Sequence, residues 1–171
     1  MTERILAIAL ARLAQGGLDG LSLDDLAASL GTSKQALYRR HTSKQALALA
    51  SLDWAIGAFS PPPPDRSNPA RDLSLLLKAC WSEVFSANLG KALVRTRHAP
   101  GFSERAAVLE QDLQFHIRQI LVATPFEQDM DLKARLLVAL LWQEAAKPSR
   151  EAGSFEDVLD KAILLVLGLG N

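Results

Sequence analysis

Apolar residues recur three and four positions apart along nearly the whole chain, and this spacing limits the possible folds more than any other feature. One such series near the start is Leu6, Ala9, Leu10 and Leu13. The spacing matches the period of an α-helix, so these side chains lie on one helix face. No segment shows the alternation of apolar and polar residues that is typical of a half-buried strand. The sequence therefore predicts an all-α fold.

Glycines and prolines divide this pattern into separate helices. Glycine adopts the left-handed backbone that ends many helices, whereas proline lacks the N–H that would continue one. The interruptions include Gly31, Pro125 and the stretch from Pro148 to Gly153. The expected helices cover residues 3–15, 22–29, 33–39, 43–59, 70–87, 90–97, 102–123, 129–146 and 154–168.

Four consecutive prolines, Pro61 to Pro64, follow the fourth expected helix. Such a run favours an extended polyproline II segment. We expect the stretch 60–69 to be a linker that acts as a spacer, and the alternative is a proline-rich binding motif.

The composition is that of a globular protein with ample apolar material for a core. Hydrophobic residues make up 49% of the 171 positions and charged residues 22%, which differs clearly from a disordered chain. The longest apolar stretch, 162–170, is far shorter than the roughly 20 residues that a membrane span needs. Cys80 is the one cysteine, so no intramolecular disulfide is possible, and the N-terminus lacks a signal-peptide pattern. We expect a cytoplasmic protein without a membrane segment.

Positive charge is concentrated in one segment although the formal net charge is zero. Residues 31–47 contain Lys34, Arg39, Arg40 and Lys44 and no Asp or Glu, a local balance of +4. A basic segment in a neutral protein indicates a surface for a polyanion. The alternative is an ordinary solvated helix face.

Capping signals define two short helices in this part of the chain. Ser22 begins the expected helix 22–29 as the N-cap of a capping box, and Gly31 follows that helix. The hexapeptide 32–37 recurs unchanged as 42–47. We interpret the repeat as one helix start used twice, in which Ser33 and Ser43, or the threonines before them, are the N-caps.

A capped helix, a glycine turn and a second short helix are the layout of a helix-turn-helix, whose second helix enters the major groove of DNA. Leu37 would anchor that helix to its partner. The first helix would contribute Leu26, Ala27 and Leu30, and the outer face of the second would carry Lys34, Gln35, Tyr38 and Arg39. This layout alone has low specificity, because many helical proteins contain it without binding DNA.

The wider pattern over residues 4–50 resembles the TetR (tetracycline-repressor) family of regulators. Its strongest part is the Leu37-Tyr38 pair with the Ser43-Lys44 pair six residues later, in register. The other matching residues are Ile5-Leu6, Ala11, Leu13, Gly17-x-x-Gly20-Leu21-Ser22, Leu26-Ala27, the run Leu30 to Arg39, and Leu47.

This resemblance implies contacts with double-stranded DNA at individual positions. Lys34, Gln35, Ala36 and Arg39 match positions that face bases, where lysine or arginine bonds guanine and glutamine bonds adenine. Positions that meet phosphates are matched by Ser22, Tyr38 and Lys44. The complete predicted DNA-binding set is Ser22, Ser33, Lys34, Gln35, Ala36, Tyr38, Arg39, Arg40 and Lys44.

Two departures from the family pattern concern single contacts. The family usually has a histidine and then a large apolar residue after the recognition helix, and here the pair is Arg40-His41. His41 is either a buried neutral histidine, which we favour, or it turns toward DNA with Arg40. Arg4 is the one basic residue at the N-terminus, so we expect no minor-groove contacts from an N-terminal arm.

The resemblance further implies a DNA-binding domain over 1–47 and a helical ligand-binding and dimerisation domain over 48–171. We expect a homodimer through the last two helices, about 129–146 and 154–168, because they are apolar on most sides; alternatively they are central helices of a monomer. The effector would be a small hydrophobic or amphipathic molecule. Its candidate pocket residues, which otherwise belong to the core, are Trp81, Phe85, Phe115, His116 and Trp142.

The remaining chemistry-bearing residues lack a pattern that indicates catalysis. Cys80 is either a redox sensor or a buried apolar side chain, and we expect His98 in a loop or on the surface. The sequence contains no metal-site spacing, nucleophile elbow or phosphate-binding loop, so we expect no enzyme, metal or cofactor. The leading hypothesis is a ligand-responsive repressor that binds a palindromic operator as a homodimer. The alternative is a helical ligand-binding or interaction protein with a decayed helix-turn-helix.

Overall fold

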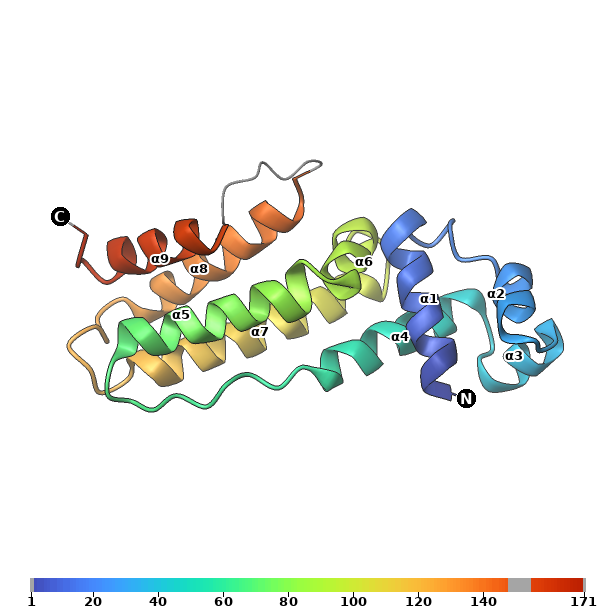
Figure 1. Cartoon of the computed structure of the whole chain (residues 1–171), viewed down its shortest axis with the longest axis horizontal. Coiled ribbons are helices and arrows are strands. Elements are labelled where there is room, and N and C mark those ends of the chain that lie inside the picture. The colour runs from blue at the N-terminus through green and yellow to red at the C-terminus, as the bar shows by residue number, and fades with distance from the viewer. Residues whose placement is uncertain (1, 148–154, 171) are drawn as a thin grey trace. The chain divides into compact units, whose positions relative to one another are not determined.

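The computed structural model describes residues 2–147 and 155–170, and the predicted break from Pro148 to Gly153 lies outside them. The described residues form helices without a β-strand, which confirms the all-α prediction (Figure 1). The elements are α1 (Thr2–Gly16), α2 (Leu23–Leu30), α3 (Lys34–Arg40), α4 (Lys44–Ala58), α5 (Pro69–Ala79), η1 (Cys80–Phe85), α6 (Asn88–Thr96), α7 (Phe102–Leu121), α8 (Met130–Ala145) and α9 (Phe155–Val166).

The predicted α-helix 70–87 is the one whose helix type differs from the prediction. It is an α-helix only as far as Ala79, and it continues as the π-helix η1. The wider π turn changes the direction in which the following side chains point. Cys80, Trp81, Val84 and Phe85 are all buried in η1. Apolar spacing does not reveal such a turn, because over six residues the same buried positions also fit an α-helix.

The described residues form two compact units, which we treat separately. Unit 1 comprises the described parts of 1–59 and 86–107, and unit 2 those of 60–85 and 108–171. Unit 1 thus includes α4 and α6 in addition to the first three helices. Its extent differs from the range 1–47 that we expect for the DNA-binding domain, and that functional division stays a prediction.

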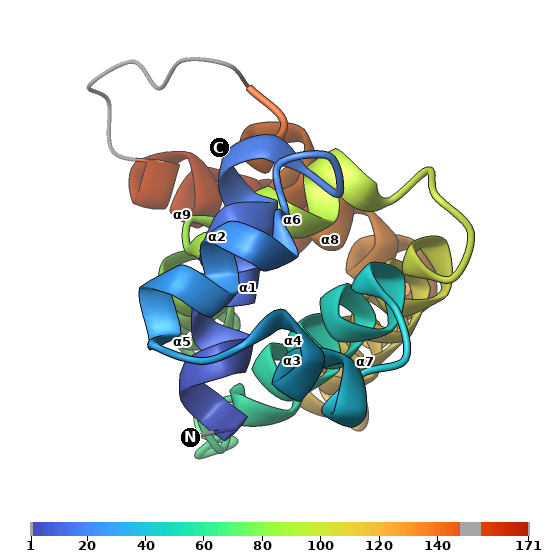
Figure 2. The same ribbon diagram turned by 90° about the vertical axis from the view of Figure 1, so that its right-hand side faces the viewer.

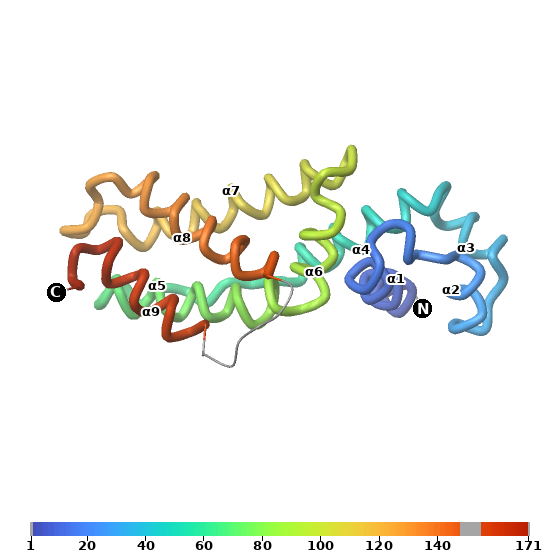
Figure 3. Tube along the Cα trace, turned by 90° about the horizontal axis from the view of Figure 1, so that it is seen from above, coloured from blue at the N-terminus to red at the C-terminus, as the bar shows by residue number. Residues whose placement is uncertain are grey.

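In unit 1, α1 is the central helix. It packs against α4 and α6, and α2 packs against both α1 and α3. Figures 1 and 3 show α6 on one side of α1 and the pair α2–α3 on the other. The fully buried side chains of this unit include Leu13, Leu21, Leu26, Leu37, Leu47, Leu52, Leu93 and Phe102.

Polar contacts hold α4 to the segment that follows α6 in the same unit. Arg105 donates from Nε and Nη2 to the two carboxylate oxygens of Asp53, at 3.0 and 3.1 Å. This bidentate geometry is the strongest form of an arginine–carboxylate pair. Gln45 at the start of α4 donates to the carbonyl of Pro100 at 3.1 Å. These contacts fix the helix that follows α3 within unit 1.

In unit 2, α5 packs against α9, and α8 packs against both α9 and η1. Asp160 on α9 accepts hydrogen bonds from Ser74 and Lys78 of α5, each at 2.7 Å. The predicted linker 60–69 contains no helix before Pro69. Its end is held by the buried Asp72, which accepts from the backbone N–H groups of Asp65 and Arg66.

Candidate nucleic-acid interface

The two caps of α2 are the residues that the sequence predicts, and its bounds, Leu23–Leu30, differ by one position from the predicted range 22–29. The Ser22 hydroxyl oxygen accepts from the N–H of Asp25 at 3.2 Å, which satisfies one of the free donors of the first turn. Gly31 has φ 62° and ψ 34°, and its N–H bonds the carbonyls of Ala27 and Ala28. Both caps are confirmed, so the chain reverses sharply between α2 and α3.

The helix α3 is short, and a single apolar side chain attaches it to the unit. Ser33 accepts from the N–H of Ala36 at 3.1 Å and thereby caps the helix. Leu37 is 1% exposed, the one buried residue of α3. Figure 2 faces this region, with α2 crossing in front of α1. The helix-turn-helix geometry therefore agrees with the sequence prediction.

The remaining side chains of α3 form rows around Leu37. Because successive residues are about 100° apart on a helix, Gln35 and Arg39 share the face opposite Leu37. Lys34 and Tyr38 form a second row, and Ala36 and Arg40 form a third on the other flank. All six are exposed except Ala36, which is half-buried. The row of Gln35 and Arg39 thus lies on the side of α3 that is directed away from its apolar anchor, Leu37.

Lys34 has an acidic partner on α2. Its Nζ lies 2.8 Å from the Asp24 carboxylate. The hydrogen bond and the negative charge of Asp24 raise the pKa of Lys34 above its usual value. Sequence reasoning missed Asp24, because the two residues are ten positions apart on different helices and neither periodicity nor capping relates them. The predicted base contact of Lys34 therefore competes with an intramolecular ion pair.

Arg40 points to another helix. Its Nη1 donates to the hydroxyl of Thr2 on α1 at 3.0 Å. This contact separates Arg40 from the row of Gln35 and Arg39. Lys44, the first residue of α4, is half-buried, and Ser43 caps that helix by accepting from the N–H of Ala46 at 3.0 Å. The structure thus brings the predicted DNA-binding residues to α3 and the two helix starts beside it, while their contacts with DNA stay predictions.

His41 follows α3 with an unpartnered ring nitrogen. Its Nε2 is buried and has no hydrogen-bond partner among the described residues. Burial lowers the pKa of His41 from its usual value, and the charge of Arg40 lowers it further. Both effects favour the neutral imidazole at neutral pH. His41 as a whole is half-buried, so these features favour the neutral histidine, while its orientation relative to DNA stays a prediction.

The five candidate pocket residues lie in two places within unit 2. Phe85 and Trp142 are buried edge to face, with ring centroids 5.0 Å apart, and Trp81 packs against Phe155 at 4.3 Å. Phe115 is exposed on α7, and its neighbour there is His116. The structure thus joins three candidates from η1 and α8 to the core and leaves the α7 pair nearer the surface. Their role as a ligand pocket stays a prediction.

The two remaining candidate residues are Cys80, which is buried, and His98, which is exposed. Cys80 is buried, and burial raises the pKa of its thiol to about 12. The reactive thiolate is therefore scarce at neutral pH, which argues against the redox sensor. His98 is exposed beyond α6, as expected, and accepts from the Arg97 side chain at 3.3 Å.

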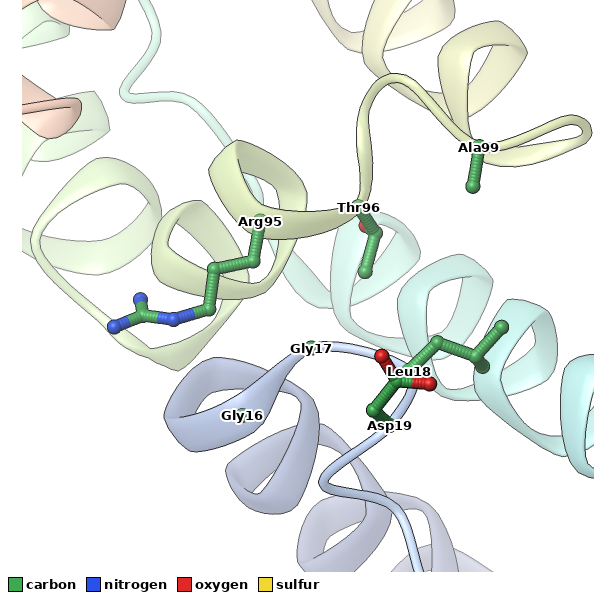
Figure 4. Close-up of a pocket in the computed structure, with 7 residues that line it drawn as sticks. All are labelled: Gly16, Gly17, Leu18, Asp19, Arg95, Thr96 and Ala99. Atoms are coloured by element: carbon green, nitrogen blue, oxygen red, sulfur yellow. The ribbon is translucent and has the colours of Figure 1, made fainter.

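A cavity of about 370 Å³ lies between the end of α1 and the end of α6 in unit 1. Figure 4 shows that the Arg95 side chain is directed away from Leu18 and Asp19. No ion pair joins Arg95 to Asp19 among the described residues. The cavity thus has no paired charges of the kind that would identify a ligand.

Two further features concern the described residues only: a cluster of metal-ligating side chains and a helix able to cross a membrane. The His, Cys, Asp and Glu side chains of these residues form no group of three that is suited to a metal ion. None of the helices that they form combines the length and apolar character that a bilayer crossing requires.

Comparisons with known proteins agree with this geometry. Residues 5–51 match the family model described as bacterial regulatory proteins, tetR family. No curated protein sequence matches the chain.

Solved structures resemble the chain over nearly its whole length. A tetR-family transcriptional regulator from Streptomyces coelicolor has a TM-score of 0.74 at 16% identity, covering 99% of this chain and 82% of the regulator. A TetR-like transcriptional regulator from Rhodococcus sp. RHA1 has 0.73 at 21% identity, covering 96% and 94%. A further transcriptional regulator from that organism has 0.72 at 19% identity, covering 99% and 95%.

The fold and the helix-turn-helix together support a DNA-binding regulator. The range 5–51 that matches the family model contains every predicted DNA-binding residue. Residues 5–51 resemble the DNA-binding domain of the tetR family, and the fold of the chain is similar to that of solved TetR-family transcriptional regulators.

Proposed function

We propose that this protein is a ligand-responsive transcriptional repressor that binds a palindromic operator in the cytoplasm as a homodimer. The observation that carries the proposal is the face of α3 opposite Leu37, where Gln35 and Arg39 are exposed on a capped helix-turn-helix. Glutamine bonds adenine and arginine bonds guanine in the major groove. This row therefore has the chemistry for sequence-specific recognition.

The phosphate contacts would come from the flanks of α3 and from helix starts. Tyr38 is exposed beside the base-contacting row, and Lys44 lies at the start of α4. The hydroxyls of Ser22 and Ser33 accept backbone hydrogen bonds as caps, and each retains its own proton to donate to a phosphate oxygen. Such contacts set orientation and affinity rather than sequence preference.

Exposed apolar side chains on α8 and α9 support the homodimer. Leu132 and Leu136 lie one turn apart on α8, and Val158 and Leu165 lie two turns apart on α9. Large apolar residues that gather on two helices in contact with each other indicate a covered surface. A second copy of the chain is the occupant that a palindromic operator requires, since its two-fold symmetry matches that of the dimer.

The effector would bind in unit 2 near η1. The Nε1 of Trp142 is buried and has no hydrogen-bond partner among the described residues. A buried donor without an acceptor is costly, and a carbonyl or hydroxyl oxygen of a ligand would satisfy it. Phe85 and Trp81, which are buried in η1, supply apolar walls. These features favour a small hydrophobic or amphipathic molecule that carries a hydrogen-bond acceptor.

Selection from randomised duplex DNA tests the DNA-binding function. The purified protein should enrich a palindromic sequence, and footprinting should show major-groove contacts in two half-sites. The double variant Lys34→Glu and Arg39→Glu should abolish binding to that sequence and lower the thermal unfolding temperature only slightly, because both side chains are exposed and the ion pair with Asp24 that is lost lies at the surface. Failure to retain any duplex at low salt, with or without candidate effectors, would contradict the proposal.

A helical binding protein with a decayed helix-turn-helix is the second candidate function. The ion pair between Lys34 and Asp24 favours it, because a lysine that contacts bases is already engaged. The same double charge reversal distinguishes the two functions. If the protein has the second function, the variant retains its ligand affinity, and neither it nor the parent protein enriches a DNA sequence.

A further inference from the structure

The third row of α3 borders a cleft that faces α1. The cleft has a volume of about 430 Å³ and lies wholly within unit 1. It extends along α3 beside the face that carries Gln35 and Arg39. The residues that line it are Ile5, Thr32, Ala36, Leu37, Arg39 and Arg40.

Every polar side chain that lines this cleft can donate a hydrogen bond to an anion. Arg39 and Arg40 contribute guanidinium groups and Thr32 contributes a hydroxyl, while no Asp or Glu lines the cleft. Neither arginine forms an ion pair with an acid among the described residues. Ile5 and Leu37 are buried and form an apolar base. A net positive cleft with an apolar base attracts a negatively charged group more strongly than an exposed arginine does.

The Thr2 hydroxyl restricts the Arg40 side chain at this cleft. It accepts one guanidinium hydrogen bond at 3.0 Å, which leaves the other N–H groups of Arg40 available. A guanidinium that is already oriented loses less conformational freedom when it binds a phosphate. Thr2 therefore acts as a positioning residue for Arg40.

We propose that this cleft binds one phosphate of the DNA backbone, with Arg40 and Thr32 as donors and Thr2 as the residue that orients Arg40. The inference rests on the proposed DNA-binding function and assigns Thr2 and Thr32 to it. A phosphodiester unit is smaller than the molecules that clefts of this volume accommodate. Because a phosphate looks the same at every base pair, Arg40 contributes affinity and register but no sequence preference. The row of Gln35 and Arg39 then carries the sequence preference.

Binding titrations against two duplexes test this division of roles. One duplex carries the sequence recovered by selection, and the other has the same composition in shuffled order. Arg40→Ala should weaken both equally, by roughly tenfold, as expected for the loss of a charged hydrogen bond. The slope of log affinity against log KCl should decrease by about 0.9, the value for one phosphate contact. Gln35→Ala should instead weaken mainly the selected duplex.

Variants of Thr2 test the positioning role independently of Arg40. Thr2→Val should weaken both duplexes to a smaller extent than Arg40→Ala, and Thr2→Ser, which keeps the hydroxyl, should restore the affinity. Arg12→Ala is the matched control, because Arg12 is exposed on α1 and lies about 15 Å along the helix from Thr2. It should leave the slope unchanged. If Arg40→Ala fails to fold, the Thr2 pair carries the test.

Three results overturn the proposal in distinguishable ways. A change in the ratio of the two affinities in Arg40→Ala means that Arg40 contacts bases. Unchanged affinity and slope in both Arg40→Ala and Thr2→Val mean that the cleft binds no phosphate, although the protein still binds DNA. If the unmodified protein binds neither duplex at low salt, the proposed function itself fails, and the cleft proposal fails with it.

Discussion

The polar side chains of α3 differ in whether they already have a hydrogen-bond partner within the protein. Gln35 and Arg39 face outward, whereas Lys34 is paired with Asp24 and Arg40 with Thr2. The four cations that the sequence groups into one basic segment are therefore not equivalent. Their different partners lead to separate predictions for single substitutions.

Asp24→Asn should strengthen DNA binding. The substitution removes the partner of Lys34 and one negative charge beside the DNA-binding face. Exposed ion pairs contribute little to stability, so we expect a gain of at most about fivefold. Fluorescence anisotropy with the selected duplex at low salt measures it. Asp25→Asn is the control, because it removes the same charge from the same turn of α2 without releasing Lys34; an equal gain in both variants would refute a specific role for the pair.

His41 should make the protein less stable in mild acid. The unfolded chain takes up a proton at the usual histidine pKa of about 6.5, whereas burial first and Arg40 second lower the pKa of His41 in the folded state. The unfolded state thus binds more protons below that pH, and stability falls as pH decreases through about 6.5 toward the lower folded pKa.

Urea unfolding at a series of pH values between about 7 and 5 measures this dependence. His41→Leu should reduce the loss of stability, because it removes the titrating ring and its unpartnered Nε2. His98→Gln, at an exposed position, should not. An equal acid sensitivity in the parent protein and in His41→Leu would refute the assignment.

Two turns between helices require glycine, at Gly31 and at Gly20, for different physical reasons. Gly31 has a positive φ of 62°, and a side chain there would meet nothing within 4 Å. A Cβ on Gly20 would lie 2.7 Å from the backbone Cα of Gly16, which is too close. The first position thus requires a backbone conformation, and the second requires space.

Gly31→Ala should destabilise the protein by about 1 kcal/mol, the cost of a left-handed alanine. Gly20→Ala should destabilise it more, because backbone atoms of the turn after α1 must move. Gly57→Ala is a control, since Gly57 lies within α4 with open space around it and without a positive φ. Chemical unfolding monitored by circular dichroism ranks the three variants. A Gly31→Ala protein less stable than Gly20→Ala would contradict this order.

At the scale of the whole molecule, the proposed homodimer depends on α8 and α9. Leu165 on α9 is 74% exposed, the highest value among the exposed large apolar residues. A separate apolar row, Val108, Phe115 and Val122, lies at heptad spacing on and just after α7. The two surfaces predict different interfaces and are distinguished by mutation.

Leu165→Glu should convert the dimer to a monomer, because a charge buried in an apolar interface is strongly unfavourable. Light scattering coupled to gel filtration measures the mass, and Gln119→Glu at an exposed position of α7 is the control. DNA affinity should fall together with dimer content. A dimer that survives Leu165→Glu but not Phe115→Glu would place the interface on α7 instead.

The helices, their caps and the face that most of them bury can be predicted from the amino-acid sequence alone. Ser22, Gly31 and Ser33 act through backbone groups a few residues away, and apolar spacing depends only on the helical period. The ends of the regular helices therefore agree with the predicted ends to within two residues. The largest difference is of the size seen at α6, which begins at Asn88 instead of residue 90. The all-α fold and the helix-turn-helix follow from the same local rules.

Contacts between side chains of different helices depend on the tertiary packing and could not be predicted from the sequence. The contact of Arg40 with Thr2 joins residues 38 positions apart, and the pairing of Lys34 with Asp24 depends on the angle between α2 and α3. The π turn at η1 and the place of α4 in unit 1 likewise result from packing. Such contacts depend on how distant segments share a core, for which local periodicity contains no information. The basic segment was therefore visible in the sequence, and the separate roles proposed for its cations were not.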